Sequence, residues 1–379
     1  MRSTKRIIWM LALALVTAPL VAEAQTYTFV DLNPSGFSSS QAWGFSGGQQ
    51  VGYGFSQATG GYHALLWSGT AASAVDLTPS QFTQSEAYGI SGGQQIGVGW
   101  GTDNINHALL WSGTAASAVD LTPSGFSSSQ AWGISGGQQV GYGNLLQVGT
   151  HALLWYGTAT SAMDLNPSGF STSYAYGTSG GQQVGWGSTY SLSNHALLWS
   201  GTAASAVDLN PSGFSTSYAY GTSGSQQVGY GYGKGGSGHA LLWSGTAASA
   251  VDLNPSGFTS SYGQDISGGQ QVGYGLKGSY YHGLLWSGAA ASAVDLQDFL
   301  PSYYLDSAAW GIDANGNIVG EAYNSSTQLY HAIIWVPVPE PATLWLLALG
   351  LGVLVMARGS RSPKNGKKSH LELLRDAEA

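Results

Sequence analysis

A histidine and an aspartate recur through this chain at a fixed spacing, and both residue types can bind metal ions and transfer protons. The histidine opens the block His-Ala-Leu-Leu-Trp, and an Asp-Leu pair follows 13 residues after it. The complete copies contain His63, Trp67 and Asp76; His107, Trp111 and Asp120; His151, Trp155 and Asp164; His195, Trp199 and Asp208; and His239, Trp243 and Asp252. Degenerate copies begin at His282 and His331, so the period is about 44 residues.

We predict a structural role for these repeated residues. A metal site needs three or four side chains within a few ångströms of one another, whereas copies on successive repeat units point in different directions. We therefore expect each histidine to be hydrogen bonded within its own unit, to the repeated aspartate or to a nearby serine. The sequence predicts no catalytic, metal-binding or cofactor-binding residue, and no cofactor.

Carboxylates outside the repeat are few, and no pair among them stands out as the acid and base of a glycoside hydrolase. They are Glu86, Asp103, Asp265, Asp298, Asp306, Asp313 and Glu321. The segment Asp313-x-Asn315-x-Asn317 resembles the start of a calcium loop, but Asn324 stands where such a loop needs glutamate. A hairpin turn explains this segment better, and we interpret the protein as not an enzyme.

Each repeat divides into four short strands separated by glycine-rich turns. In the unit 130–165 we expect strand a at 131–135, strand b at 138–142, strand c at 151–155 and strand d at 162–165. The a–b turn is Gly-Gly in most copies and Asn315-Gly316 in the seventh. Both sequences suit a type I′ turn, in which the two central residues need positive φ.

The repeat predicts an all-β fold, a seven-bladed β-propeller. Strand c is apolar on both faces, so it needs packed layers on both sides, which radially arranged blades provide. There are seven HxxxW strands and seven Asp-Leu strands, but Asp31-Leu32 precedes the first HxxxW and none follows the last. We expect strand 27–32 to complete the last blade, in a way similar to tryptophan–aspartate repeat propellers. The alternative is an open β-solenoid, which would need end caps.

The unit also resembles the HAF-type extracellular repeat, which has a His-Ala-Phe core before Leu-Trp. Leucine replaces the phenylalanine in every complete copy here. The resemblance implies an exported repeat protein and brings no known activity. Residues 25–337 form the predicted repeat domain.

Residues 1–24 have the pattern of a signal peptide. A basic start is followed by the apolar run 7–21 and by a small-x-small cleavage site at Ala22 and Ala24. We therefore expect the mature chain to begin at Gln25. The alternative is an uncleaved anchor, for which the apolar run is short.

The other end carries a second membrane signal. Val338, Pro339, Glu340 and Pro341 precede an uncharged segment, 343–357, and a basic cluster that includes Arg358 and Arg361. We predict a transmembrane helix at 343–357 with the basic side in the cytoplasm. The tail 362–379, which contains both basic and acidic residues, would then be cytoplasmic.

Residues 338–361 resemble the PEP-CTERM sorting signal of Gram-negative bacteria. The resemblance implies recognition by an exosortase, anchoring in the inner membrane before processing, and release or attachment outside the cell, often where exopolysaccharide is made. The tail after Arg361 is longer than is usual for such signals. The alternative is a plain tail anchor that is never cut.

Composition excludes several classes of function. Between Gln25 and Pro341 the cations are Lys234 and Lys277 against 15 acidic residues, so the net charge of this part is near −13. Nucleic acid is therefore not a predicted partner, because phosphate contacts need lysine and arginine. The chain contains no cysteine, which excludes disulfides and thiolate metal sites.

The loops between strands b and c vary while the rest of the repeat is nearly fixed. They emerge on one face of the predicted propeller and contain polar residues with scattered aromatic rings, a mixture that suits sugar stacking. They read FSQATGGY (55–62), WGTDNIN (100–106), NLLQVGT (144–150), STYSLSN (188–194), YGKGGSG (232–238), LKGSYY (276–281) and YNSSTQLY (323–330).

Two functions fit these observations. The first is a non-enzymatic exported protein of the cell surface or of the exopolysaccharide matrix, with the exosortase and extracellular polysaccharide as its expected partners. The alternative is a propeller lectin that binds glycans through the variable face, and a hydrolase is a distant third.

Overall fold

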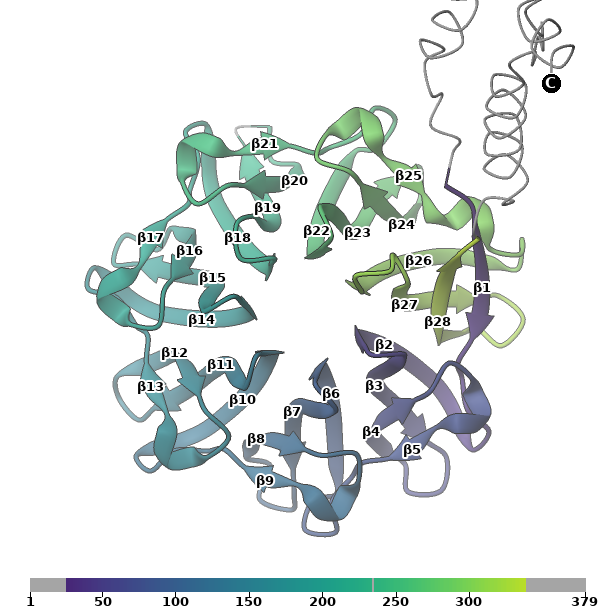
Figure 1. The fold of residues 1–379 in the computed structure, drawn as a ribbon, viewed down its shortest axis with the longest axis horizontal. Coiled ribbons are helices and arrows are strands. Elements are labelled where there is room, and N and C mark those ends of the chain that lie inside the picture. Colours follow the sequence, from purple (N-terminus) through teal and green to yellow (C-terminus); the bar gives the residue numbers. More distant parts are fainter. Residues whose placement is uncertain (1–24, 234, 339–379) are drawn as a thin grey trace, which may run out of the picture. The chain divides into compact units, whose positions relative to one another are not determined.

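The computed structural model describes residues 25–233 and 235–338, and this part of the chain is a seven-bladed β-propeller (Figure 1). Seven antiparallel four-stranded sheets stand around a central axis, and each sheet is one blade. The fold class predicted from the 44-residue period is confirmed. The predicted signal peptide, residues 1–24, and the predicted helix 343–357 lie outside the described residues.

Each blade uses four strands in the order a, b, c, d from the axis outward (Figure 1). The a strands are β2 (Phe37–Ser46), β6 (Gln84–Ser91), β10 (Phe126–Ser135), β14 (Phe170–Ser179), β18 (Phe214–Thr222), β22 (Ser260–Ser267) and β26 (Tyr304–Ile312). The b strands are β3 (Gln49–Ser56), β7 (Gln94–Trp100), β11 (Gln138–Leu145), β15 (Gln182–Thr189), β19 (Gln227–Gly233), β23 (Gln270–Lys277) and β27 (Ile318–Asn324).

The outer half of each blade is shorter. The c strands are β4 (Gly61–Trp67), β8 (Asn106–Trp111), β12 (Gly149–Trp155), β16 (Asn194–Trp199), β20 (Gly238–Trp243), β24 (Tyr280–Trp286) and β28 (Leu329–Pro337). The d strands of blades 1 to 6 are β5 (Val75–Asp76), β9 (Val119–Asp120), β13 (Met163–Asp164), β17 (Val207–Asp208), β21 (Val251–Asp252) and β25 (Val294–Asp295), and β1 (Tyr27–Asp31) completes blade 7.

Short 3₁₀ helices stand between strands c and d, where the sequence predicted simple glycine turns. They are η1 (Ala71–Ser73), η2 (Ala115–Ser117), η3 (Ala159–Ser161), η4 (Ala203–Ser205), η5 (Ala247–Ser249) and η6 (Ala290–Ser292), and η7 (Leu296–Phe299) follows β25. In each of η1 to η6 the serine hydroxyl donates to the carbonyl three residues earlier, as from Ser117 to Thr114 at 2.6 Å. This local bond stabilises the turn between strands c and d.

The strand boundaries differ from the prediction at both edges of a blade. Strand a of blade 3 begins at Phe126, five residues earlier than expected, because this serine-rich stretch pairs with the end of strand b. Strand d is only two residues long, Met163–Asp164. The serine-rich stretch lacks alternating apolar residues, so cross-strand pairing alone makes it a strand.

The a–b hairpins confirm the turn prediction for Gly-Gly and correct it for Asn-Gly. Gly136 and Gly137 have φ of 58° and 80°, as a type I′ turn requires. In the a–b turn of blade 7, Gly316 has positive φ but Asn315 does not. The Asp313 carboxylate accepts the backbone N–H groups of Asn315 and Asn317, each at 2.9 Å, and this bonding stabilises a longer turn in place of type I′.

A glycine in strand b lets strands a and b approach closely at a bulge. A Cβ added to Gly141 would lie 1.9 Å from the carbonyl oxygen of Gln130. The register of strands a and b shifts between Ala131 and Gly133, as at a β-bulge. No larger residue fits at Gly141 without displacing this backbone.

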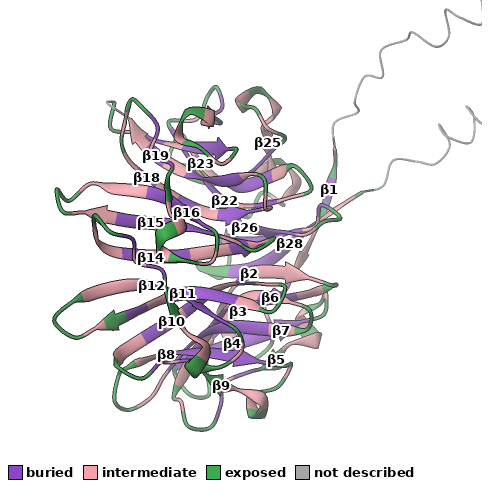
Figure 2. Cartoon of the chain, turned by 60° about the vertical axis from the view of Figure 1, so that its left-hand side comes forward, coloured by how far each residue is buried: buried purple, intermediate pink, exposed green. Residues whose placement is uncertain are grey.

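The core consists of apolar clusters at the seams between neighbouring blades. Trp111 of blade 2 is fully buried against Val51, Ala64 and Leu66 of blade 1, and equivalent tryptophans fill the other seams. Strand c therefore contributes both of its faces to packing, as predicted. Figure 2 shows the buried segments in the middle of the strands and the exposed ones in the loops.

The N-terminal strand closes the ring as predicted. β1 pairs with β28 in antiparallel register from Tyr27 opposite Pro337 to Asp31 opposite Ile333. The Leu32 N–H donates to the Ala332 carbonyl at 2.8 Å, and the corresponding bond in blade 3 joins Leu165 to Ala152. Blade 7 is thus built from both ends of the repeat domain.

Residues 25–233 and 235–337 form one compact unit. Within the described ranges, no helix has both the length and the apolar character needed to span a membrane.

Candidate functional site

Every blade contains the predicted histidine–aspartate hydrogen bond. In blade 3, His151 Nδ1 lies 2.7 Å from Asp164 Oδ2, and Asp164 Oδ1 accepts the Asn166 N–H at 2.8 Å. The aspartate therefore joins strands c and d and also anchors the link to the next blade. The other pairs are His63–Asp76, His107–Asp120, His195–Asp208, His239–Asp252, His282–Asp295 and His331–Asp31.

These pairs stay separate, since each is confined to a single blade. No group of three or more His, Asp or Glu side chains that could hold a metal ion occurs within residues 25–233 and 235–338. The repeated His–Asp pair is thus used in building the blade.

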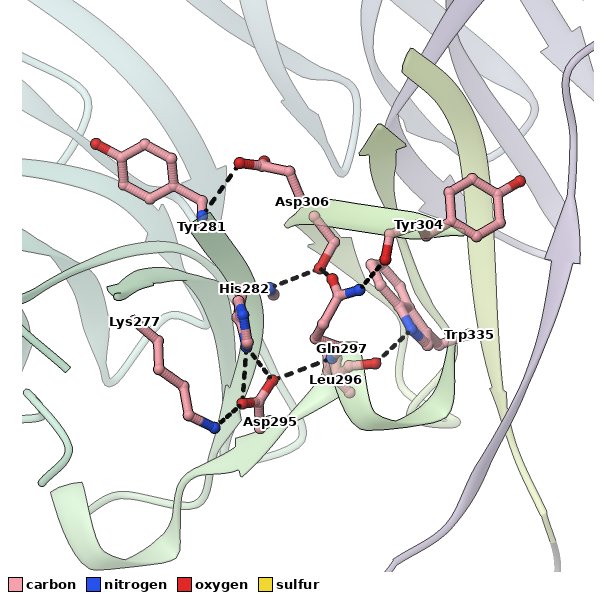
Figure 3. Close-up of polar contacts among 11 residues, drawn as sticks. Lys277, Tyr281, His282, Asp295, Leu296, Gln297, Tyr304, Asp306 and Trp335 are labelled. Atoms are coloured by element: carbon pink, nitrogen blue, oxygen red, sulfur yellow. Dashed lines mark hydrogen bonds and ion pairs between the residues drawn. The ribbon is translucent and has the colours of Figure 1, made fainter. Parts of the chain in front are cut away.

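Blade 6 adds a cation to its pair (Figure 3). The Lys277 ammonium lies 2.8 Å from Asp295 Oδ2, which His282 Nδ1 also approaches at 2.9 Å. Burial alone would raise the pKa of Asp295, but the hydrogen bonds from His282 and Lys277 lower it below its ordinary value. Figure 3 also shows the Trp335 indole N–H donating to the Leu296 carbonyl across the seam to blade 7.

Two tyrosine-rich hollows open near the b–c loops, on the face that the variable segments indicated. We call the first the acidic hollow; its volume is about 360 Å³. It is lined by Tyr230, Tyr232, Tyr262, Tyr274, Tyr281, Asp306, Ala308, Trp310, Glu321 and Tyr330, from blades 5, 6 and 7.

The second hollow lies at the seam between blades 7 and 1, and we call it the neutral hollow. Its volume is about 220 Å³. Tyr330 lines both hollows, so they are neighbours on one face. The neutral hollow is lined by Ser39, Ser40, Gln41, Tyr53, Gly54, Tyr62, Tyr323, Gln328, Leu329 and Tyr330.

The acidic hollow brings together two carboxylates that the sequence analysis did not pair. Asp306 lies on β26 and Glu321 on β27, and the register places Asp306 opposite Tyr323, two residues from Glu321. Side chains two residues apart share a face of the sheet. The sequence alone did not pair these two residues, because strand pairing brings together positions that are 15 residues apart in the chain.

Burial sets the electrostatics of this pair. Glu321 is 9% exposed, and its Oε2 atom has no hydrogen-bond partner among the described residues. Burial raises the pKa of Glu321 to about 7; the nearby Trp310 indole N–H lowers this pKa, and the Asp306 charge raises it slightly further. Burial also raises the pKa of Asp306, which accepts the Tyr281 backbone N–H at 3.1 Å (Figure 3).

The remaining off-period carboxylates line neither hollow. Glu86 accepts the Tyr88 hydroxyl at 2.5 Å, and Asp313 holds the blade 7 hairpin. Asp265 bonds the backbone N–H groups of Ile266 and Ile312 across the seam between blades 6 and 7, and burial raises its pKa to about 6. Asp103 lies 3.9 Å from His107 Nε2, and Asp298 belongs to η7.

Aromatic side chains from the a strands line the central channel. Trp43 stacks on Trp310 with ring centroids 4.4 Å apart, and Tyr88 stacks on Trp132 at 4.0 Å. These rings, with those of Tyr176, Tyr220 and the strand b tyrosines, line a cavity of about 400 Å³ near the a–b hairpins. The rings pack against one another, and this packing joins neighbouring blades near the axis.

A comparison with protein families finds the PEP-CTERM protein-sorting motif at residues 337–362. This match spans Val338, Pro339, Glu340, Pro341, Arg358 and Arg361, the residues assigned to the sorting signal. It supports a PEP-CTERM exported protein that is anchored in the membrane before processing. From Pro339 onward the motif lies outside the described residues. No curated protein matches the chain.

Solved structures with similar architecture contain peptidase propellers. The β-propeller domain of the Trilobed protease from Pyrococcus furiosus, described as having an open velcro topology, has a TM-score of 0.53 and 10% identity over 79% of this chain and 95% of that one. A puromycin hydrolase mutant has a TM-score of 0.53 and 10% identity over 79% of this chain and 56% of its own. The Pyrococcus horikoshii acylaminoacyl peptidase has a TM-score of 0.52 and 9% identity over 84% of this chain and 55% of its own.

These similarities concern the fold alone, because the identities are near 10%. The chain spans just over half the length of the puromycin hydrolase and of the acylaminoacyl peptidase.

Proposed function

We propose that this protein is a non-enzymatic, exported repeat protein of the cell surface or of the exopolysaccharide matrix, sorted by an exosortase in a Gram-negative bacterium. The sorting motif at residues 337–362 carries the proposal. Residues 1–24 act as the signal peptide, residues 25–337 as the displayed HAF-type repeat domain and residues 343–357 as the membrane helix before processing. The propeller supports a display role, because its repeated His–Asp pairs are used in building the blades.

Replacing Pro339, Glu340 and Pro341 together by alanine tests the sorting step. In a host that has an exosortase, the variant should remain in the inner membrane at full length, while the unchanged protein is processed. Pro363→Ala, just beyond the matched segment, is the control and should be processed normally. Processing and release of the triple variant would show that the motif is not the signal.

The absence of catalysis is tested by turnover. The purified protein should hydrolyse neither polysaccharides nor peptides above background. Turnover that disappears in Glu321→Gln or Asp306→Asn, and persists in Glu86→Gln, would overturn the non-enzymatic proposal and identify the acidic hollow as an active site.

The alternative function, a propeller lectin, is favoured by the two tyrosine-lined hollows on the b–c loop face. Rings of Tyr62, Tyr281 and Tyr330 are each more than a third exposed, and they flank serine, glutamine and carboxylate side chains. Aromatic faces beside hydrogen-bonding groups can stack on and orient sugar rings. We infer that the glycan-binding surface, if the protein is a lectin, comprises these hollows.

An array of bacterial and plant polysaccharides tests this function. Binding should fall in Tyr330→Ala, since Tyr330 lines both hollows, and persist in Tyr190→Ala, whose exposed ring lies in the b–c loop of blade 4 and lines neither. If no polysaccharide on the array binds, the lectin function is excluded and the surface-protein function remains.

A further inference from the structure

The acidic hollow has the chemistry of a site for a positively charged sugar. Resting on the glycan binding proposed above, we propose that it binds an amine-bearing hexosamine unit, with a free ammonium group, inside a longer oligosaccharide whose neighbouring unit occupies the neutral hollow.

The carboxylates carry the first step of this inference. Glu321 is nine-tenths buried and lines the hollow, yet its Oε2 atom has no hydrogen-bond partner among the described residues. The Trp310 indole N–H, which lines the same hollow, lowers the pKa of this carboxylate, but burial outweighs that effect. A buried carboxylate whose hydrogen bonding is incomplete is unfavourable, so a ligand that brings a further donor to the hollow would stabilise it. Asp306 lines the same hollow and uses one oxygen on the Tyr281 N–H (Figure 3). Two carboxylates that face one cavity favour a cationic donor.

The repeat shows that Glu321 is a local addition to the blade. Glu321 pairs with Ala332 on strand c, and the residue in this place in the other blades is always aromatic or aliphatic. Those residues are Tyr53, Val98, Tyr142, Trp186, Tyr230 and Tyr274. The blade therefore does not need a charge at this position, so its folding does not explain the glutamate.

The charges around the hollow also select the ligand. None of the described residues that line either hollow is a lysine, arginine or histidine. A uronic acid or a sulfated sugar would therefore meet the like charges of Asp306 and Glu321. An ammonium group would pair with Asp306 and Glu321 in a desolvated site, where such contacts are strongest.

The tyrosines supply the second half of the recognition. Tyr274 stands perpendicular to Tyr281 with ring centroids 5.4 Å apart, and it lies beside Tyr262 at 5.1 Å. Rings that are held by one another keep their orientation before the ligand arrives. Their faces attract a cation and stack on the apolar side of a sugar ring, a combination that matches an amino sugar.

The neighbouring hollow accounts for the length of the ligand. Tyr330 separates the acidic hollow from the neutral one, whose Ser39, Gln41, Tyr62 and Gln328 offer hydroxyl and amide groups without charge. One sugar unit of the oligosaccharide would thus contact the carboxylates, while the next unit contacts uncharged donors and acceptors. A lysine side chain of a peptide would use only the first hollow.

The ligand-side test compares three oligosaccharides of equal length on the full-length protein in detergent. They are an oligomer of glucosamine, the same oligomer fully N-acetylated, and an oligomer of galacturonic acid. We expect the glucosamine oligomer to bind at least about tenfold more tightly than the N-acetylated one, because acetylation removes the charge that the carboxylates meet. The galacturonic acid oligomer should not bind.

The protein-side test removes each carboxylate without changing its shape. Glu321→Gln and Asp306→Asn should each weaken binding of the glucosamine oligomer by on the order of tenfold and leave binding of the N-acetylated oligomer nearly unchanged. Glu86→Gln is the matched control, because Glu86 is a half-buried carboxylate that lines neither hollow. It should bind the glucosamine oligomer like the unchanged protein.

The outcomes separate this inference from the lectin function on which it rests. Equal or tighter binding of the N-acetylated oligomer, or of galacturonic acid, would overturn the amine assignment while the lectin stands. If no sugar binds, either in this comparison or on the array, both the amine assignment and the lectin function are excluded. A lysine-rich peptide that competes fully at the same concentration as the glucosamine oligomer would overturn the sugar assignment in favour of a basic peptide.

Discussion

Asp31 and His331 are 300 positions apart in the sequence and are hydrogen bonded at 2.8 Å, Oδ2 to Nδ1. Their geometry is that of the pairs inside the other blades, such as His151 and Asp164 at 2.7 Å. The Tyr304 hydroxyl also donates to Asp31 Oδ2 at 2.9 Å. Asp31 on the N-terminal strand β1 thus holds this strand to β28 and β26 of blade 7.

Removing residues 25–33 should therefore destabilise the whole propeller. The deletion takes away β1, exposes the edge of β28 and opens the seam that contains Trp335. We expect a clearly lower Tm than that of the intact protein, measured by differential scanning fluorimetry. The point variant Asp31→Ala should lower the free energy of unfolding by about 1–3 kcal/mol, because it leaves hydrogen-bonding groups of His331 and Tyr304 without their acceptor. A deletion variant that melts no earlier than the intact molecule would contradict closure by β1.

Truncating a seam tryptophan should be among the most damaging changes to the blades. Trp111 is fully buried between blades 1 and 2, so Trp111→Ala should lower the free energy of unfolding by about 3–5 kcal/mol through the cavity it leaves. Tyr190→Ala, at a ring that is 76% exposed, should change it by less than about 0.5 kcal/mol. Chemical denaturation of the two variants measures the contrast. Similar losses would mean that the seams are not the core.

Adding one methyl group in strand b should prevent close pairing with strand a. In Gly141→Ala the new Cβ would stand 1.9 Å from the Gln130 carbonyl oxygen, which is backbone and cannot rotate away. We expect a loss of at least about 2 kcal/mol, typical of severe overpacking. Gly235→Ala is a control, since a Cβ there meets nothing within 4 Å and its φ is not positive. Thermal melting of both proteins distinguishes the close approach from a general intolerance of glycine replacement.

Glu321 should make the protein less stable as the pH rises towards neutrality. Burial raises its pKa from 4.5 to about 7, so the folded state binds a proton more tightly than the unfolded state does. The stabilising contribution is present below about pH 4.5 and is lost as the pH rises through 7. Glu321→Gln cannot ionise, so we expect it to melt at a higher temperature than the unchanged protein at pH 8 and at a similar one at pH 4.5. The difference between the two melting curves over this range is the measurement, because Asp265, whose pKa is raised to about 6, contributes equally to both. Parallel curves would show that Glu321 titrates normally.

The sequence predicted most of the architecture, and particular residues show why. The spacing of His63, His107 and the later copies fixes the number of blades, since each period supplies one strand c. The first Asp-Leu pair, at Asp31, precedes every HxxxW strand, and the last HxxxW strand, at His331, has no Asp-Leu pair after it. This offset predicted the closing strand, because the incomplete unit at one end of the domain can complete the incomplete unit at the other. The turn at Asn315 was predicted less well, since its geometry depends on the Asp313 side chain.

The acidic pair was missed for a different reason. Asp306 and Glu321 were treated as isolated residues, yet they face one hollow with tyrosines from three blades. A signal was present in the sequence, because aligning the seventh repeat with the others places Glu321 where most copies have an aromatic residue. Recognising that signal requires knowing which strand b positions face inward.

By itself, the sequence determined the blade count, the strand order, the His–Asp pairs and the sorting motif, because these follow from short-range patterns repeated along one chain. The tertiary structure decided which of the residues that differ from the repeat lie close together. Side chains from blades 5, 6, 7 and 1 come together only when the ring closes and brings both ends of the domain side by side. Such convergence depends on strand register and on the curvature of the whole ring, and neither of these is encoded within a single period.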